Sequence, residues 1–217
     1  MSLIEKLSNS LAFKIASTLN MDKDREEVLA YGAFAIFQTL WSIALVIILG
    51  AIFDVLLESL TISFTTAMLR KYSGGAHATS PNRCAIIGAI AAVGLALILN
   101  RFLVSINPIG IFIFGVISFI SAYYIIYKYA PVDTPNKPII REETKTRLKK
   151  LSFKFVHALL VITSALYFLY FSNIDSIISL KIFFSICLGI AWQILTLTSI
   201  GHYVIAKADI LLNKINL

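Results

Sequence analysis

A histidine and a cysteine, His77 and Cys84, lie seven residues apart in the stretch RKYSGGAHATSPNRC, residues 70–84. A cysteine thiolate is a strong nucleophile, and a nearby imidazole can act as the base that takes the thiol proton. Along a straight helix, seven residues span about 10.5 Å, which is too far for a hydrogen bond. The two glycines before the histidine, together with Pro81, disfavour such a helix, so the chain can fold back and bring the two side chains together. This pairing is expected of a cysteine hydrolase or an acyl-transfer enzyme.

The cysteine also lies where a helix can begin, because Ser80 or Asn82 can cap a helix whose first turn holds Pro81 and Cys84. Free backbone N–H groups in that turn, including that of Cys84, favour an anion and are candidate oxyanion donors. The residues alone leave two other interpretations open. His77 and Cys84 can be polar and small residues of an ordinary turn, or two ligands of a metal site, although zinc usually takes three or four protein ligands. We expect no metal and no cofactor.

These residues are set in a chain that is too apolar for a soluble domain. Of its 217 residues, 58% are hydrophobic and 14% are charged, and the mean hydropathy is +0.83. A soluble domain has about 45–50% apolar and about 25% charged residues. The apolar runs can cross a hydrocarbon core about 30 Å thick, which predicts an all-α integral membrane protein with about six transmembrane helices. Four runs are clear, at residues 30–53, 84–99, 102–127 and 182–206, and two are weaker, at 55–69 and 155–171.

The first 20 residues lack the continuous apolar core and the small-residue cleavage site of a secretory signal. Leu3, Leu7 and Leu11 instead recur at helical spacing, with Lys6 on the other side. We expect an N-terminal amphipathic helix over residues 1–20 that lies in the membrane interface or packs on the protein's own loops.

The net charge of +7 is distributed in a way that indicates a membrane, and not a nucleic acid, as the partner. With six crossings and a cytoplasmic N-terminus, only Arg101 and Lys181 of the 19 Lys and Arg residues lie outside. Basic residues of short loops stay on the cytoplasmic side. We therefore predict that both termini, the 70–84 loop and the largest loop, residues 128–154, are cytoplasmic. That largest loop has a proline-rich part followed by a basic run, which can also anchor the chain to anionic headgroups.

The stretch at 70–84 and a second stretch, APVDTPNKP at 130–138, resemble the accessory gene regulator B family of membrane peptidases. The resemblance covers nearly the whole chain and implies a single membrane peptidase domain over residues 1–217 in a bacterial cell membrane. It implies that Cys84 is the nucleophile and His77 its general base. The implied substrate is a quorum-sensing propeptide of the accessory gene regulator D type. Its C-terminal tail would be cut off through a thioester on Cys84, and its own cysteine would then close a thiolactone ring, or a serine a lactone ring as in some relatives.

Further site residues follow from the same resemblance and from position. They are Gly74, Gly75 and Arg70 as support for the catalytic loop, Lys71, Lys137 and Arg141 as contacts for an acidic propeptide tail, and Asp133, Asn136 or Ser80 as the group that orients His77. The small residues Gly88 and Ala92, four apart in one run, permit close helix contact within the chain or across a homodimer. Two other functions remain open. A peptide transporter without proteolytic activity would need polar residues along several spans, and a lipid-handling transferase would need an aspartate-rich metal motif.

Overall fold

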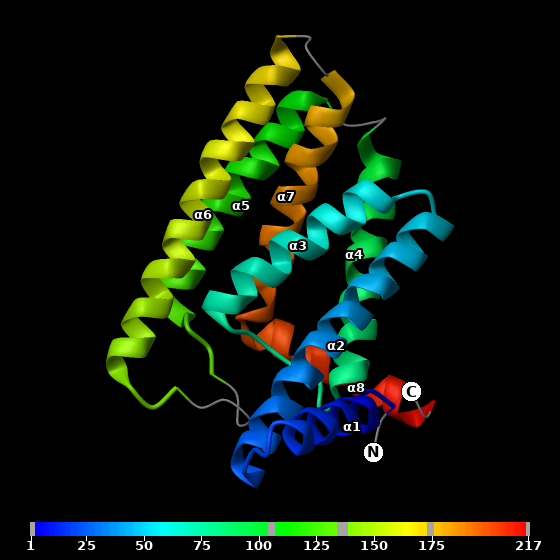
Figure 1. Cartoon of the computed structure of the whole chain (residues 1–217). Coiled ribbons are helices and arrows are strands. Elements are labelled where there is room, and N and C mark those ends of the chain that lie inside the picture. Colours follow the sequence, from blue (N-terminus) through cyan, green and yellow to red (C-terminus); the bar gives the residue numbers. More distant parts are fainter. Residues whose placement is uncertain (1–2, 104–106, 134–138, 173–175, 216–217) are drawn as a thin grey trace. The chain divides into compact units, whose positions relative to one another are not determined.

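The regular structure of the chain is helical (Figure 1). The computed structural model describes residues 3–103, 107–133, 139–172 and 176–215. Within these residues there is no β-strand, so the predicted all-α class is confirmed. The helices are α1 (Leu3–Thr18), α2 (Lys23–Ile52), α3 (Leu56–Ser73), α4 (Pro81–Leu103), α5 (Pro108–Tyr129), α6 (Glu142–Phe171), α7 (Ser176–Thr196) and α8 (Ser199–Lys214).

Among the described residues, five helices are long and apolar enough to cross a membrane, namely α2, α4, α5, α6 and α7. The chain is therefore a multi-pass membrane protein, and the predicted count of about six spans is close. The apolar stretch of α7 is 67% buried inside the protein, whereas those of the other four are 11–33% buried. α7 is thus the central helix, and the others expose much of their surface, as lipid-facing helices do.

The chain divides into two compact units, residues 1–45 and residues 46–217, and α2 contributes to both. In the first unit, the small residues Ser8, Ala12 and Ala16 of α1 are buried. Leu3, at 74% exposure, and Leu7, at 53%, lie on its open surface. The amphipathic helix predicted for residues 1–20 is therefore formed, and its leucines are available to lipid.

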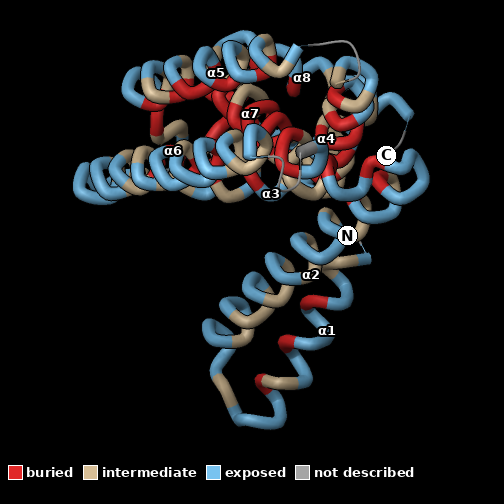
Figure 2. Tube along the Cα trace, turned by 90° about the horizontal axis from the view of Figure 1, so that it is seen from above, coloured by how far each residue is buried: buried red, intermediate tan, exposed pale blue. Residues whose placement is uncertain are grey.

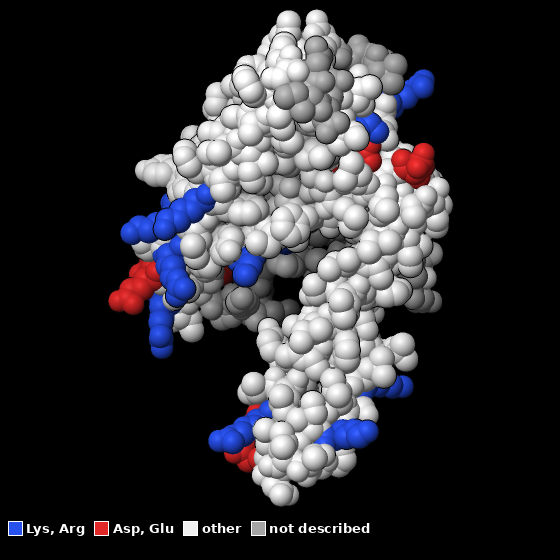
Figure 3. Space-filling model, turned by 45° about the horizontal axis from the view of Figure 1, so that its top comes forward, with Lys and Arg blue, Asp and Glu red and all other residues white. Residues whose placement is uncertain are grey.

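In the second unit, α7 packs against α3, α5, α6, α4 and α8. Figure 2 shows the buried residues gathered where these helices face one another. The fully buried residues of this core include Ile190 and Cys187 of α7, Leu69 of α3, Ile126 of α5 and Val156 of α6. On the face of this unit drawn in Figure 3, charged side chains form separate groups with a broad uncharged surface between them. That distribution is expected of a protein whose middle faces hydrocarbon.

α3 runs beside α7 in the same direction. Near the start of both helices, Lys181 Nζ donates to Glu58 Oε1 at 2.7 Å. Near their ends, Gln193 Nε2 donates to Ser73 Oγ at 3.0 Å. The weak run predicted at 55–69 therefore lies along α7, but α3 is not among the five described helices that are long and apolar enough to cross a membrane. The end that holds Ser73 also holds the loop with His77 and Cys84.

The apolar run predicted as one span over 182–206 is wrong in its bounds, because α7 ends at Thr196 and α8 begins at Ser199. The Thr198 hydroxyl accepts a hydrogen bond from the Gly201 N–H at 3.3 Å and so caps α8. Hydropathy does not report such a turn, because the hydroxyl residues Thr196, Thr198 and Ser199 are only weakly polar and lie among apolar residues. The turn brings α8 against α4, and Asp209 of α8 pairs with Arg83 near the start of α4.

Of the two small residues of α4 that permit close helix contact, Ala92 is buried within the chain. No described atom outside its own helix lies within 4 Å of the position of a Gly88 side chain. The homodimer stays a prediction.

Candidate active site

The loop between α3 and α4 begins with a turn that only glycine can make. Gly74 has φ +70° and Gly75 has φ +137°, a region that side chains rarely adopt. A Cβ on Gly74 would overlap the Val132 carbonyl, and one on Gly75 would lie 2.6 Å from Thr196 Oγ1. The two glycines therefore serve both the turn and the close approach of Val132 and Thr196.

Backbone hydrogen bonds join this turn to two distant segments. The Val132 N–H donates to the Ser73 carbonyl at 2.9 Å, which docks the residues after α5 on the turn. The Ala76 N–H donates to the Thr196 carbonyl at 2.9 Å, which docks the loop on the end of α7. The two sequence stretches that carried the resemblance, at 70–84 and at 130–138, thus meet at Ser73 and Val132.

Gln193 holds the turn from inside the bundle. Its side chain is fully buried in α7, and its Nε2 donates to the Gly74 carbonyl at 2.7 Å as well as to Ser73 Oγ. A buried carbonyl away from water needs such a partner. This polar residue in an apolar span therefore fixes the start of the loop.

At the other end of the loop, α4 begins with Pro81 at its first helical position, and Ser80 occupies the cap position. The Cys84 N–H donates to the Ser80 carbonyl at 2.9 Å. The prediction that the Cys84 N–H is free to bind an oxyanion is therefore wrong. The physical reason is that Cys84 is the fourth residue of the helix, where the regular i to i−4 bond first forms.

The loop folds back between these two anchors and brings His77 to Cys84. His77 Nδ1 lies 3.8 Å from Cys84 Sγ, within reach of a long sulfur hydrogen bond. Cys84 is half-buried and part of His77 remains exposed, so a substrate can reach both. Catalytic hydrogen bonds are often long without substrate and tighten in the reacting complex.

The imidazole is neutral near pH 7. Burial, the positive charge of Arg70 and, less strongly, His202 together lower the pKa of His77 to about 4. Since a base must be unprotonated to accept a proton, this environment keeps His77 in the form that can act as a base throughout the neutral pH range.

A carboxylate on α8 clamps the loop. Asp209 accepts hydrogen bonds from the Thr79 N–H at 3.1 Å, from the Thr79 hydroxyl at 2.7 Å and from Arg83 Nε at 2.6 Å. Arg83 Nη2 also donates to Thr79 Oγ1 at 2.7 Å. Burial by itself raises the pKa of Asp209, but the bonds from Arg83 and Thr79 bring it below its ordinary value. We call these three residues the Asp209 clamp; it fixes the positions two residues after His77 and one before Cys84.

The group that orients His77 is not among the candidates that the structure describes. Neither the Ser80 hydroxyl nor the Asp133 carboxylate hydrogen-bonds to His77 in the described part of the chain; Asp133 is exposed and interacts with Lys145 instead. Asn136 lies outside the described residues.

The predicted tail-binding residues are scattered over this end of the protein. Lys71 is exposed at the end of α3, and Arg141 is exposed just before α6. Lys137 lies outside the described residues. The structure does not bring Lys71 and Arg141 into contact with His77 or Cys84.

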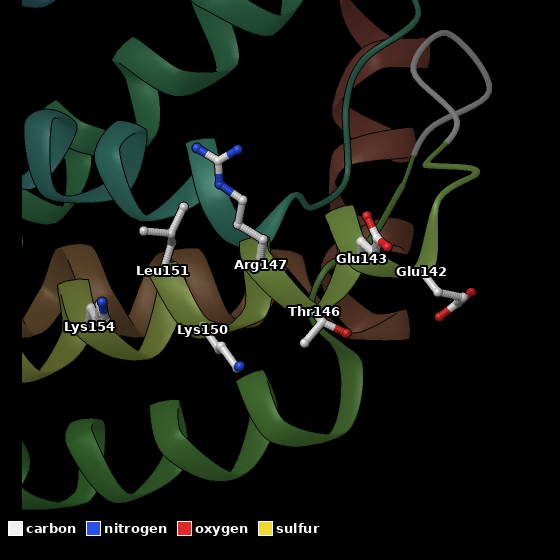
Figure 4. Close-up of a pocket in the computed structure, with 7 residues that line it drawn as sticks. All are labelled: Glu142, Glu143, Thr146, Arg147, Lys150, Leu151 and Lys154. Atoms are coloured by element: carbon white, nitrogen blue, oxygen red, sulfur yellow. The ribbon is translucent and has the colours of Figure 1, made fainter.

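A shallow, open groove of about 670 Å³ lies along the first turns of α6. Figure 4 shows the side chains of Arg147 and Leu151 on one side of the helix and those of Thr146 and Lys150 on the other. Its lining residues are Glu142, Glu143, Thr146, Arg147, Lys150, Leu151 and Lys154. The basic ones belong to the basic run predicted at 141–154, which gives an anionic ligand a surface to contact.

Sequence reasoning missed Asp209 and the structural role of Gln193. Asp209 is the sole acidic residue after Asp175, which was an available signal. Gln193 was visible as a polar residue within an apolar run, and such residues are usually functional. Neither signal says which loop the residue contacts.

In chemical terms, the arrangement holds a thiol, a neutral base and a buried guanidinium at the end of a helical bundle. The sequence model of the accessory gene regulator B family (AgrB) matches residues 8–197. An AgrB-like protein of Clostridium perfringens is 41% identical over 214 residues, which is 98% of this chain and all of the relative. AgrB-like proteins of Listeria monocytogenes and Clostridium acetobutylicum are 28% identical over 83% of this chain and 25% identical over 75% of it, and these matches cover 85% and 75% of those relatives. No solved structure matches the chain.

Proposed function

The chain belongs to the accessory gene regulator B family, and from this premise we propose that it is a membrane cysteine endopeptidase that processes a quorum-sensing propeptide. Family membership supports a role in quorum sensing and a propeptide of the accessory gene regulator D type as the partner. The observation that carries the enzymatic proposal is the 3.8 Å approach of His77 Nδ1 to Cys84 Sγ, with an imidazole that is neutral near pH 7.

In the first step, Cys84 Sγ attacks the carbonyl carbon at the end of the signal segment, and His77 Nδ1 takes the thiol proton. The π electrons of the carbonyl move to its oxygen and form a tetrahedral intermediate. When that intermediate collapses, the C–N bond breaks and His77 gives its proton to the departing amine of the C-terminal tail. The signal segment remains on Cys84 as a thioester.

In the second step, a cysteine thiol of the propeptide attacks this thioester. His77 takes the proton of the attacking thiol as the new S–C bond closes the ring, the bond between the acyl carbon and Cys84 Sγ breaks, and His77 returns the proton to Cys84. One thioester replaces another, so the energy of the acyl bond is retained, whereas attack by water would release it. The site must therefore hold the internal thiol close and exclude water, which are gains expected from proximity and desolvation.

We place the site on the cytoplasmic side, because the charge pattern requires it, and we regard the basic groove of α6 as a contact for the acidic tail. The groove, the exposed Lys71 and the exposed Arg141 all lie on segments that enter or leave the same end of the bundle. Long-range attraction to this end would concentrate an acidic peptide near Cys84.

The test uses the purified protein in lipid vesicles with a propeptide of the accessory gene regulator D type. We expect Cys84→Ala to abolish cleavage and Cys84→Ser to leave little of it, and we expect a thioester adduct on Cys84 by mass spectrometry. Cys187→Ala is the matched control, because Cys187 is buried in α7 away from the loop and should keep activity. Cleavage at the normal rate by Cys84→Ala would refute the proposal.

A further inference from the structure

Arg70, in the last turn of α3, carries a guanidinium that is buried and unpaired. Its Nε and Nη2 atoms are shielded from solvent and have no hydrogen-bond partner among the described residues. The acidic side chain of the adjoining loop anchor, Asp209, is already committed to Thr79 and Arg83. A buried cation without a counter-ion is costly, so its retention indicates that an anion forms or binds beside it.

An anion forms near Arg70 during the reaction proposed for Cys84 and His77. Arg70 interacts electrostatically with the sulfur of Cys84 and with the ring of His77. The Arg70 carbonyl accepts a hydrogen bond from the Gly74 N–H at 2.9 Å, which ties the end of its helix to the turn that begins the catalytic loop. The guanidinium is therefore held by a rigid element next to the reacting groups, as preorganised stabilisation requires.

Other donors at this position are already used or uncharged. The Cys84 N–H donates to Ser80, and the His77 ring is neutral near pH 7. The remaining titratable neighbour from a packed element is His202 of α8, and Arg83 on the helix of Cys84 is paired with Asp209. Arg70 is thus a permanent cation that interacts electrostatically with the sulfur and whose Nε and Nη2 have no partner within the described residues.

We propose that Arg70 is a further catalytic residue, whose Nε and Nη2 donate hydrogen bonds to the scissile carbonyl oxygen as Cys84 attacks it. The inference rests on the proposed function. As the Sγ–C bond forms, the carbonyl π electrons move to the oxygen, and the thiol proton goes to His77. The oxygen then carries the full negative charge, which the guanidinium fork binds with two donors. When the C–N bond breaks, that electron pair returns to re-form the carbonyl and Arg70 is again unpaired. Two donors of one planar group in a buried site bind such an oxygen more strongly than neutral donors do.

The test compares Arg70→Gln and Arg70→Lys with the matched control Arg101→Gln, which removes an exposed arginine at the opposite end of α4. Cleavage of the propeptide in vesicles is measured over a range of substrate concentrations. We expect Arg70→Gln to lower kcat by about 10²–10³-fold and to leave KM within about threefold, as loss of an oxyanion donor does. Arg70→Lys should recover part of kcat, because it restores the charge without the fork, and Arg101→Gln should match the wild type.

A second readout follows from charge alone. Arg70→Gln removes a cation that helps to lower the pKa of His77 to about 4, so the acid limb of kcat/KM should move toward neutral pH. A role for Arg70 in packing only would not move that limb. Alkylation of Cys84 by iodoacetamide, followed by mass spectrometry, checks that each variant still presents the thiol.

The outcomes separate this inference from the function on which it rests. If Cys84→Ala does not cleave but Arg70→Gln keeps kcat within about threefold of the wild type, the Arg70 inference is wrong and the cysteine mechanism stands. A raised KM with unchanged kcat would make Arg70 a substrate-binding group and would also overturn it. If Arg70→Gln does not fold, the kcat of Arg70→Lys becomes the deciding measurement. A full wild-type kcat in that variant excludes a role for the guanidinium fork.

Discussion

The Asp209 clamp gives the sharpest test of how tertiary contacts hold the catalytic loop. Asp209→Asn keeps the size of the side chain and removes its charge. An amide has one acceptor oxygen, so it cannot accept from Thr79 and Arg83 on two oxygens, as the carboxylate does at 2.7 Å and 2.6 Å. The perturbation therefore releases one side of the clamp and leaves Arg83 without its counter-ion.

The expected size follows from burial. The side chains of Arg83 and Asp209 are 16% and 8% exposed, so water replaces little of what is lost. Breaking a buried pair by removing one partner costs about 3–5 kcal/mol, and the partial exposure of Arg83 places this pair at the lower limit, about 3 kcal/mol. A penalty of about 3 kcal/mol on the docked loop corresponds to at most about a 160-fold loss of rate. We expect kcat/KM to fall by about 10–100-fold.

Two measurements are made on Asp209→Asn. Propeptide cleavage in vesicles reports the loss of rate, and amide hydrogen exchange reports whether residues 76–83 undock. The Thr79 N–H donates to Asp209, so its exchange should become faster. Asp22→Asn is the matched control, because Asp22 is exposed and pairs with Arg25 in the other unit. It should change neither readout.

A double variant that removes the charges of both Asp209 and Arg83 tests the electrostatic reason for this effect. The double variant Asp209→Asn/Arg83→Gln no longer buries an arginine that has lost its carboxylate, so its melting temperature should exceed that of Asp209→Asn alone. Wild-type cleavage together with unchanged exchange in residues 76–83 for Asp209→Asn would refute the clamp. A double variant less stable than the single one would refute the electrostatic reason given for it.

Two further predictions concern the turn and the base. Gly75→Ala should lower cleavage at least tenfold, because its φ of +137° and the Thr196 hydroxyl at 2.6 Å exclude a side chain, whereas Gly88→Ala, in open space on α4, should retain cleavage and melt at the same temperature or higher. Equal effects of the two substitutions, compared by cleavage rate and thermal melting, would contradict this. Because the pKa of His77 is lowered to about 4, the base stays unprotonated as the pH falls below 7 and is lost only near pH 4. At pH 5.5 about 97% of His77 is then neutral, against about one-tenth for an ordinary histidine, so an acid limb of kcat/KM centred at 6.5 would count against the assigned environment.

Much of the site was predictable from local sequence. Gly74 and Gly75 predict a turn with positive φ, Pro81 predicts the first turn of a helix, and together they allow His77 to fold back on Cys84. The structure has each of these features. Local sequence rules did not predict that the Cys84 N–H is hydrogen-bonded, because this depends on the residue at which α4 begins. They also gave no partner for His77, since neither Ser80, three residues on, nor Asp133, in the stretch at 130–138, hydrogen-bonds to it in the described part of the chain.

The sequence by itself determined that the chain is an all-α multi-pass membrane protein with a polar loop that holds a histidine and a cysteine. The reason is that transfer to hydrocarbon is favourable residue by residue, so runs of apolar residues report spans without any knowledge of packing. Tertiary structure alone decided that Asp209, 130 residues from Thr79, clamps the loop, and that Gln193, 119 residues from Gly74, anchors its first turn. It also decided that two guanidinium nitrogens of Arg70 are buried without a partner among the described residues, where their charge acts on the Cys84 sulfur. Such contacts depend on which faces of α3, α7 and α8 meet, and no single segment contains that information.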